Sequence, residues 1–558
     1  MTAFTHSSVG ANKGIPERLI GENGTQKITA VFTLFLITQK LNTVNFFMTD
    51  FTGRKQFAKN LAITWIAHLF VVMAGFIVPR QMSDSLGQNA LGIWDLGWVA
   101  VNYLTLTGFG VGPALSREVA YLRSTGNIEK LRKTASTVQM MLTVVAIAIA
   151  LFAVFISEPV ARMVLKDDIH SVAEASTVLT LLILSLAIKI MAMPSGGILA
   201  GCHRWDLQNG LNGIHDFLLA AALLACLWLG YDLVILAYIV FIAAIFVSIA
   251  RVFLGQIQIP EVKLISGGWS TPIANKMLRF GGKTLLIQIP SIVTFQTSAL
   301  FLAGALGPAA LAVLNRSVAL TRHIEQAIQK VAAMFSPMTS GSIGLDEQTD
   351  HYTLLVRGAR DCMLIALPAA IGLGFVGDLL VLIWMGPEYS DHMLVMILAV
   401  GSVLPFTQVG TAQVLVGLDA HGRMAKWTII TTTITIIICV SAAFMIGWSV
   451  LVAASVIAIT RTVGSGIAVQ VYVARTCNVS WWRFFIDTLQ FPLLLNVPLL
   501  IFISLGRLCF DYGDWHIALL LVALGFACTL GLYFLKVIPQ PLKDKLFEAL
   551  PFRKQKQG

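Results

Sequence analysis

The sequence predicts an all-α polytopic membrane protein with about 14 transmembrane helices, arranged as two parallel six-helix lobes plus two C-terminal helices. Composition, the spacing of apolar runs and an internal repeat predict this fold class. Of 558 residues, 56% are hydrophobic and only 12% are charged, and the mean hydropathy is +0.79. Soluble domains carry about 25% charged residues. The composition therefore excludes a soluble enzyme, a disordered chain and a nucleic-acid-binding module, despite a pI near 9.3.

Apolar runs of spanning length recur along most of the chain. A helix that crosses a bilayer needs about 20 mostly apolar residues. Transmembrane β-barrels alternate apolar and polar residues and do not reach this hydropathy. The predicted helices cover, in order, residues 59–79, 88–113, 134–157, 174–199, 211–229, 232–254, 281–304, 308–333, 360–380, 391–416, 427–447, 450–473, 485–506 and 516–537.

The two ends of the chain differ from the rest. Residues 1–56 form a polar N-terminal extension, and Met48 is an alternative start just ahead of a basic cluster. Residues 541–558 form a basic tail. Lysine and arginine favour cytoplasmic loops. With a cytoplasmic N-terminus, 25 of these residues fall on the cytoplasmic side and four on the other. We therefore expect a multi-pass protein of the bacterial inner membrane with both termini in the cytoplasm.

An internal repeat supports the two lobes. The segment LGQNALGIW (86–94) aligns without gaps to LGPAALAVL (306–314), an offset of 220 residues. A weaker match, at an offset of 216, pairs residues 197–206 with 413–422. A shift of six helices leaves both copies running in the same direction, as in transporters built from parallel repeats. The predicted domains are an N-lobe (57–256, helices 1–6), a C-lobe (257–476, helices 7–12) and helices 13–14 (477–540).

Ionisable residues inside the predicted helices indicate a cationic interior. A charge at membrane depth costs at least about 2.5–3.5 kcal/mol, so it should face protein or water. Helix 308–333 carries a broad cationic face that cannot lie against lipid. Either Glu325 and neighbouring helices pair with these cations, or the face lines a water-filled cavity. Cations at low dielectric select anions, and arginine suits phosphate. The predicted substrate-binding residues of this cavity are Arg316, Arg322, His323, Lys189, Arg461 and Lys283.

A second set of polar residues is expected to line the same interior or to carry a coupling ion. Several are repeat partners at the offset of 220: His68 with Gln288, Asp95 with Asn315 and Asn102 with Arg322. Asp95 is either a counter-ion for Arg316 or Arg322, or the carrier of a coupling proton. The predicted polar and coupling residues are Asp95, Asn102, Asn315, His68, Gln288 and Asp216.

Nothing in the sequence indicates an enzyme, a metal site or a cofactor. The triplet Gly282–Thr284 resembles the end of a phosphate-binding loop, but Met277 stands where that motif needs glycine. The seven cysteines are scattered, without a metal-ligand spacing. The chain is therefore expected to be a non-enzymatic transporter without cofactors, driven by a gradient.

Two segments carry a resemblance to a known family. LGIWDLGWVAVNYLTLTGFGVGPALSREVAYLRSTGN (91–127) and GILAGCHRWDLQNGLNGI (197–214) resemble the polysaccharide-biosynthesis or O-antigen flippases of the multidrug/oligosaccharidyl-lipid/polysaccharide exporter superfamily. The resemblance covers about residues 57–540. It implies alternating access and, as substrate, undecaprenyl-pyrophosphate-linked oligosaccharide for surface polysaccharide such as O-antigen, capsule or exopolysaccharide. It also implies partners: the lipid bilayer and polysaccharide polymerase or export machinery, but no nucleic acid.

The chain departs from that family in one helix, and three other functions stay open. The family often carries an acidic residue in helix seven, where this chain (281–304) has none. A multidrug or cation antiporter of the same superfamily would need membrane carboxylates, for which Asp95 and Asp216 are the candidates. The lipid II flippase branch is expected to carry basic residues in its first helix, which here offers only His68. A membrane glycan polymerase or ligase would need a large outer loop, and no predicted one exceeds about 20 residues.

Overall fold

The computed structural model describes residues 54–108, 110–165, 169–260, 262, 267–333, 335–336, 338–339, 351–418 and 420–537, without the side chains of 54–69, 169–170 and 283–284. Most of the predicted N-terminal extension and the predicted basic tail lie outside these residues. The chain divides into two compact units, residues 1–62 and 63–558. The following account concerns the second unit, whose regular elements are all helices within the described ranges.

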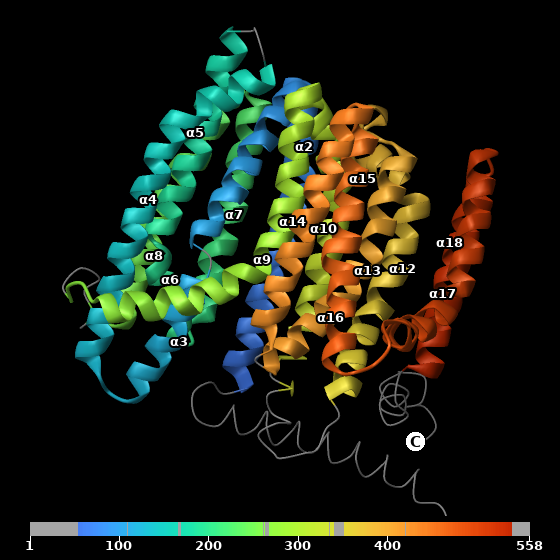
Figure 1. The fold of residues 1–558 in the computed structure, drawn as a ribbon. Coiled ribbons are helices and arrows are strands. Elements are labelled where there is room, and N and C mark those ends of the chain that lie inside the picture. The colour runs from blue at the N-terminus through green and yellow to red at the C-terminus, as the bar shows by residue number, and fades with distance from the viewer. Residues whose placement is uncertain are drawn as a thin grey trace, which may run out of the picture. The chain divides into compact units, whose positions relative to one another are not determined.

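Every predicted span coincides with helical structure (Figure 1). The elements are α2 (Arg54–Thr105), η1 (Leu106–Gly108), α3 (Val111–Ser124), α4 (Ile128–Leu165), α5 (Ile169–Met191), α6 (Met193–Gly201), α7 (Trp205–Trp228), α8 (Leu233–Gln258), α9 (Thr271–Leu306), α10 (Pro308–Ala332), α12 (His351–Met385), η2 (Pro387–Tyr389), α13 (His392–Gly417), α14 (His421–Ile446), α15 (Val450–Thr460), η3 (Arg461–Ile467), α16 (Ala468–Thr476), α17 (Trp481–Asp511) and α18 (Trp515–Lys536).

Eleven helical segments among the described residues are long and apolar enough to cross a membrane. The eleven do not include α2, which contains the first two predicted spans on either side of the non-helical Gly87 and whose side chains up to residue 69 lie outside the described residues. They do not include α10 either, because Arg316, Arg322 and Glu325 make it too polar. The all-α multi-pass fold is thus confirmed, and the polar α10 becomes its exceptional helix.

The second predicted helix, 88–113, ends earlier than expected. α2 stops at Thr105, and the chain turns through η1 into the separate helix α3. Gly110 ends the turn with φ of 82°, and a Cβ there would lie 2.4 Å from the carbonyl oxygen of Gly281. Only glycine combines this backbone conformation with so close an approach. The sequence shows the glycines of this region, but not the contact with α9 that requires one of them.

The structure reproduces the internal repeat in backbone detail. Gly87 and Gly307, repeat partners at the offset of 220, have nearly the same conformation: φ 85° and ψ 172° against φ 86° and ψ 179°. Each stands directly before the second predicted span of its repeat, which begins at residue 88 in one half and at residue 308 in the other. This region of φ and ψ is essentially restricted to glycine. Both halves therefore break their helices at the same place and in the same way.

A second pair of glycines confirms the repeat through packing. A Cβ on Gly201 would lie 2.6 Å from the Cβ of Val119 and 2.7 Å from the carbonyl oxygen of Ser116. A Cβ on Gly417 would lie 2.7 Å from the equivalent atoms of Thr339 and Ser336. The contacted residues are also 220 apart. The same close approach is thus present in both halves, although the boundaries of the lobes stay a prediction.

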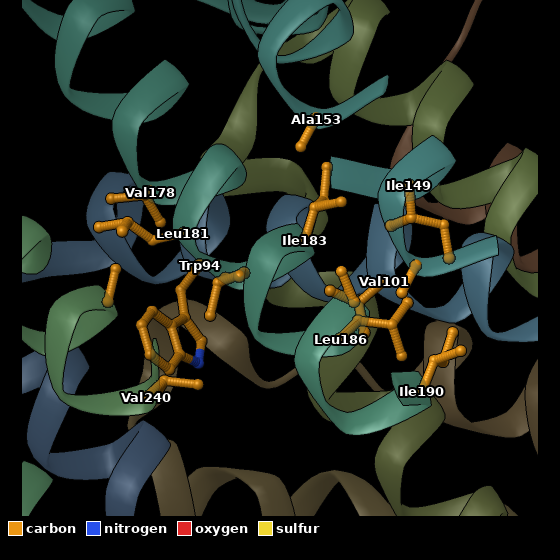
Figure 2. Close-up of a cluster of buried hydrophobic side chains, with 14 of the residues drawn as sticks. Trp94, Val101, Ile149, Ala153, Val178, Leu181, Ile183, Leu186, Ile190 and Val240 are labelled. Atoms are coloured by element: carbon orange, nitrogen blue, oxygen red, sulfur yellow. The ribbon is translucent and has the colours of Figure 1, made fainter. Parts of the chain in front are cut away.

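The N-terminal half is held together by a large apolar core. Many of its residues come from α2, α4, α5 and α8, among them Trp94, Val101, Ile149, Ile183 and Val240 (Figure 2). α5 packs against both α4 and α8, and α13 packs against α10, α12 and α15 in the other half (Figure 1). α17 joins the second group through Arg507, whose Nη1 lies 2.9 Å from a carboxylate oxygen of Asp378 on α12. These packed groups fix the positions of α2, α9 and α10, which carry the site.

Candidate functional site

The site is built around α10 because that helix carries its charges between apolar contacts. Leu311, Leu314 and Val318 are buried and anchor α10 in the apolar interior. Its first turn lies against α2, where a Cβ on Gly92 would fall 1.9 Å from the carbonyl oxygen of Pro308. This close approach brings the next turn of α2 beside the polar face of α10.

Asp95 and Arg316 form a buried ion pair between the two repeats. The Nη2 of Arg316 donates hydrogen bonds to both carboxylate oxygens of Asp95, each at 2.7 Å. Both side chains are more than nine-tenths buried. Asn315 is within hydrogen-bonding reach of the same carboxylate, and the guanidinium lies 5.9 Å from the ring of Trp384. Of the two roles open for Asp95 in the sequence, the geometry supplies the counter-ion.

A second buried pair joins α10 to the end of α15. The Nη2 of Arg461 donates to a carboxylate oxygen of Glu325 at 2.8 Å, and the Arg461 side chain is only 6% exposed. Arg461 opens η3, a seven-residue π-helical segment within an otherwise α-helical span. π-helical turns inside α-helices are frequent at functional sites. The close packing of Gly464 and Gly466 against Thr432 and Leu404 accompanies this distortion.

Arg322 is the third arginine of the cluster. Its guanidinium lies 4.5 Å from the ring centre of Phe295 on α9, and that of Arg461 lies 4.8 Å from the same ring. Stacking on aromatic rings suits a guanidinium. No carboxylate of the described residues lies within ion-pair distance of Arg322, although Glu325 and Asp95 act on it electrostatically. Three guanidiniums therefore face two carboxylates, which leaves one positive charge.

A polar cavity of about 210 Å³ opens beside that excess charge. Arg322 and Glu325 contribute ionic groups, and the remaining polar walls are amides and a hydroxyl. Such groups donate and accept hydrogen bonds without adding charge. The cavity is lined by Asn102, Ser291, Ile292, Phe295, Gln296, Arg322, Glu325, Gln326 and Gln329.

Five residues of α2, α10, α12 and η2 contact one another and are called the seal: Phe76, Trp384, His323, Ser83 and Tyr389. The Nε1 of Trp384 donates to the carbonyl oxygen of Phe76 at 2.7 Å, and the His323 ring stacks on Phe76 with centroids 5.2 Å apart. The hydroxyls of Ser83 and Tyr389 are 2.6 Å apart. His323, expected in the cavity, thus belongs to a contact that joins α2 with α10 and α12.

Two of the predicted residues lie in a different cluster. Lys189 on α5 and Asp216 on α7 interact electrostatically with each other and with Arg251 on α8. The Nη2 of Arg251 also donates to Asn212 at 2.7 Å. The expectation of one interior for all these residues is therefore wrong: Lys189 and Asp216 sit between helices of the N-terminal half.

Three predicted residues are left. Gln288 is exposed and is not among the residues that line the described cavity, and the side chains of Lys283 and His68 lie outside the described residues. Sequence reasoning missed Phe295 and Arg251. Phe295 looks like any apolar helix residue, and Arg251 lies at the end of a predicted span, where arginine ordinarily signals topology.

Comparisons with known proteins agree with this architecture. A family model for MatE proteins matches residues 65–215, whereas no curated protein sequence matches the chain significantly. An inward-facing multidrug resistance MATE family transporter of the MOP superfamily is similar, with a TM-score of 0.60 at 16% identity over 75% of this chain and 98% of its own. The lipid II flippase MurJ, in an inward closed conformation, is similar with a TM-score of 0.62 at 12% identity, over 86% of this chain and 100% of its own.

A MOP superfamily transporter from Pyrococcus furiosus Vc1, described as having a binding pocket of reverse polarity, gives a TM-score of 0.56 at 14% identity over 77% and 95%. The chain has the fold of a MOP superfamily transporter. The fold that the resemblance implies is thus confirmed, while the superfamily and its polysaccharide branch stay predictions.

Proposed function

We propose that the protein moves a lipid-linked oligosaccharide, held by its pyrophosphate, across the bacterial inner membrane by alternating access. The observation that supports this most is the charge of the arginine cluster. Asp95 and Glu325 each form an ion pair with an arginine, and Arg322 remains as an extra cation beside the polar cavity. A cation held by protein at low dielectric attracts anions, and the guanidinium fork fits phosphate oxygens.

The amides that line the cavity suit the sugar part of such a substrate. Asn102, Gln296, Gln326 and Gln329 each offer donors and acceptors that match hydroxyl groups. The cavity of about 210 Å³ is smaller than a complete oligosaccharide. Alternating access requires it to widen as the substrate enters, with polymerase or export machinery taking over the product on the far side.

A flipping assay tests this proposal. The purified protein, reconstituted in liposomes, should move a fluorescent polyprenyl-diphosphate oligosaccharide between leaflets. A hydrogen bond to a charged group contributes about 1.5–3 kcal/mol, so Arg322→Gln should slow flipping by about tenfold or more. Arg423→Gln, which removes an exposed arginine at the start of α14, is the matched control. Flipping at the unaltered rate by Arg322→Gln would contradict the proposal.

A multidrug or cation antiporter is the second candidate. The MatE match and the buried Asp95 favour it. In that case, cells lacking the gene should become sensitive to ethidium while their surface glycans stay intact, and Asp95→Asn should abolish efflux. The pairing of Asp95 with Arg316 counts against this reading, because a neutralised carboxylate holds an organic cation poorly.

A further inference from the structure

A second cationic cavity, distinct from the arginine cluster, lies within the N-terminal half. It has a volume of about 670 Å³ and is walled by α3, α6, α7 and α8. Such a volume is typical of small-molecule sites. Its charged and polar walls are Arg117, Arg251, His203 and Gln208, with a floor of small residues on α6. No carboxylate is among the residues that line it.

Two polar atoms of this cavity have no partner. The Nε of Arg251 and the Oε1 of Gln208 are buried without a hydrogen bond to any described residue. Both side chains approach Gly196, where a Cβ would lie 3.5 Å from the Cδ of Arg251 and 3.6 Å from the Oε1 of Gln208. A buried donor without a partner costs about 1–3 kcal/mol of free energy. A ligand that accepts a hydrogen bond from Arg251 would recover that cost. The Gln208 amide can turn its NH₂ group toward the same ligand.

The surrounding elements favour an anion. α7 begins at Trp205, on the rim of the cavity, and Arg204 at its start makes no capping hydrogen bond through its side chain. The Asp206 carboxylate in the first turn of α7 pairs with Arg204 at 3.1 Å, so the excess positive charge at the cavity comes from Arg117 and Arg251 rather than from this helix end. Behind the cavity, Lys189 offsets the Asp216 carboxylate that acts on Arg251.

The rim of the cavity points to a lipid rather than a free ion. Trp205 is 44% exposed beside it. Tryptophan is enriched where the hydrocarbon core meets the lipid headgroups. We infer that this cavity binds the phosphate of a lipid headgroup, with Arg251 and Arg117 as its ligands. The inference does not depend on what the arginine cluster transports.

Lipid retention by the purified full-length protein tests the inference. The probes are phosphatidylglycerol, with phosphatidylcholine as the zwitterionic comparison, and affinity is followed by native mass spectrometry and thermal stabilisation in detergent. Arg251→Gln should weaken phosphatidylglycerol binding by about tenfold or more. Arg423→Gln should leave it unchanged. Wild-type affinity in Arg251→Gln would overturn the assignment.

Two variants that place opposite charges at Ala120 test the cavity without removing any of its polar side chains. Ala120 lines the cavity and is half-buried. Ala120→Glu should abolish phosphatidylglycerol binding by repulsion, whereas Ala120→Lys, of similar size, should keep or strengthen it. Equal losses in the two variants would show a steric effect and contradict a phosphate site. This comparison stands even if Arg251→Gln does not fold.

A second probe identifies the source of the phosphate. Geranylgeranyl diphosphate replaces phosphatidylglycerol in the same variants. If it binds at least tenfold more tightly and follows the same charge dependence, the site is confirmed and the headgroup is that of a diphosphate carrier lipid. Arg322→Gln separates this inference from the proposed function, because it should slow flipping by about tenfold or more while leaving binding at Arg251 unchanged.

Discussion

Arg316 on α10 holds the carboxylate of Asp95 on α2, 221 residues away in sequence, through two hydrogen bonds of 2.7 Å in the buried interior. The pair joins the second helix of one repeat to the second helix of the other. Neither charge is tolerable there alone, since each would face a low dielectric without compensation. The contact between the repeats therefore depends on both residues together.

Removing one partner of this pair should destabilise the protein strongly. Asp95→Asn or Arg316→Gln leaves a buried charge uncompensated, a change that typically costs about 3–5 kcal/mol. The double variant should lose less than the sum of the two. Thermal unfolding in detergent of the four proteins measures the coupling. Additive losses would show that the pair is not energetically linked.

The repeated helix break makes a prediction about backbone strain. At Gly87 and Gly307 a Cβ meets no atom within 4 Å, so a substitution acts through φ and ψ alone. Gly87→Ala and Gly307→Ala should each cost about 1–3 kcal/mol. Gly75→Ala is the control: it also has open space but lies in regular helix, where alanine is favoured. Unfolding temperatures that fall equally in all three variants would contradict this account.

The packing glycines make a separate prediction. Gly201→Ala and Gly417→Ala would force apart α6 from α3 and α13 from Ser336 and Thr339, because a Cβ clashes with backbone in both places. Overpacking of this kind typically costs about 1–3 kcal/mol. Gly422→Ala, with nothing within 4 Å, should have little effect. Thermal unfolding measures all three, and tolerance of Gly201→Ala would refute the close approach.

The seal should control how readily α2 separates from α12. Trp384→Phe keeps an aromatic ring but removes the donor to the carbonyl oxygen of Phe76, and Tyr389→Phe removes the contact with Ser83. Each change should speed deuterium uptake in residues 76–85 and 384–392, as measured by mass spectrometry. Trp228→Phe, at a tryptophan that is 77% exposed, is the control. Unchanged uptake in both seal variants would show that other contacts hold this region closed.

Much of the fold follows from the order of residues along the chain. Apolar runs long enough to span a bilayer define the helices locally, because each helix satisfies its own backbone hydrogen bonds. The repeat was also visible, since Gly87 and Gly307 need glycine for reasons internal to their own backbone. The polar face of α10 follows from Arg316, His323 and Lys330, which stand seven residues apart and so share one face of a helix.

Pairing could not be predicted in the same way. The sequence offered Arg316 and Arg322 equally as partners for Asp95, and only the packing of α10 on α2 selects Arg316. The tertiary structure also places His323 in the seal rather than in the predicted cavity, and it places Lys189 and Asp216 in a cluster with Arg251. The distance between two helices depends on the side chains of both, and no single helix records it. The sequence therefore determined which charges are buried, and the fold decided which are neutralised and that Arg322 is the one left over.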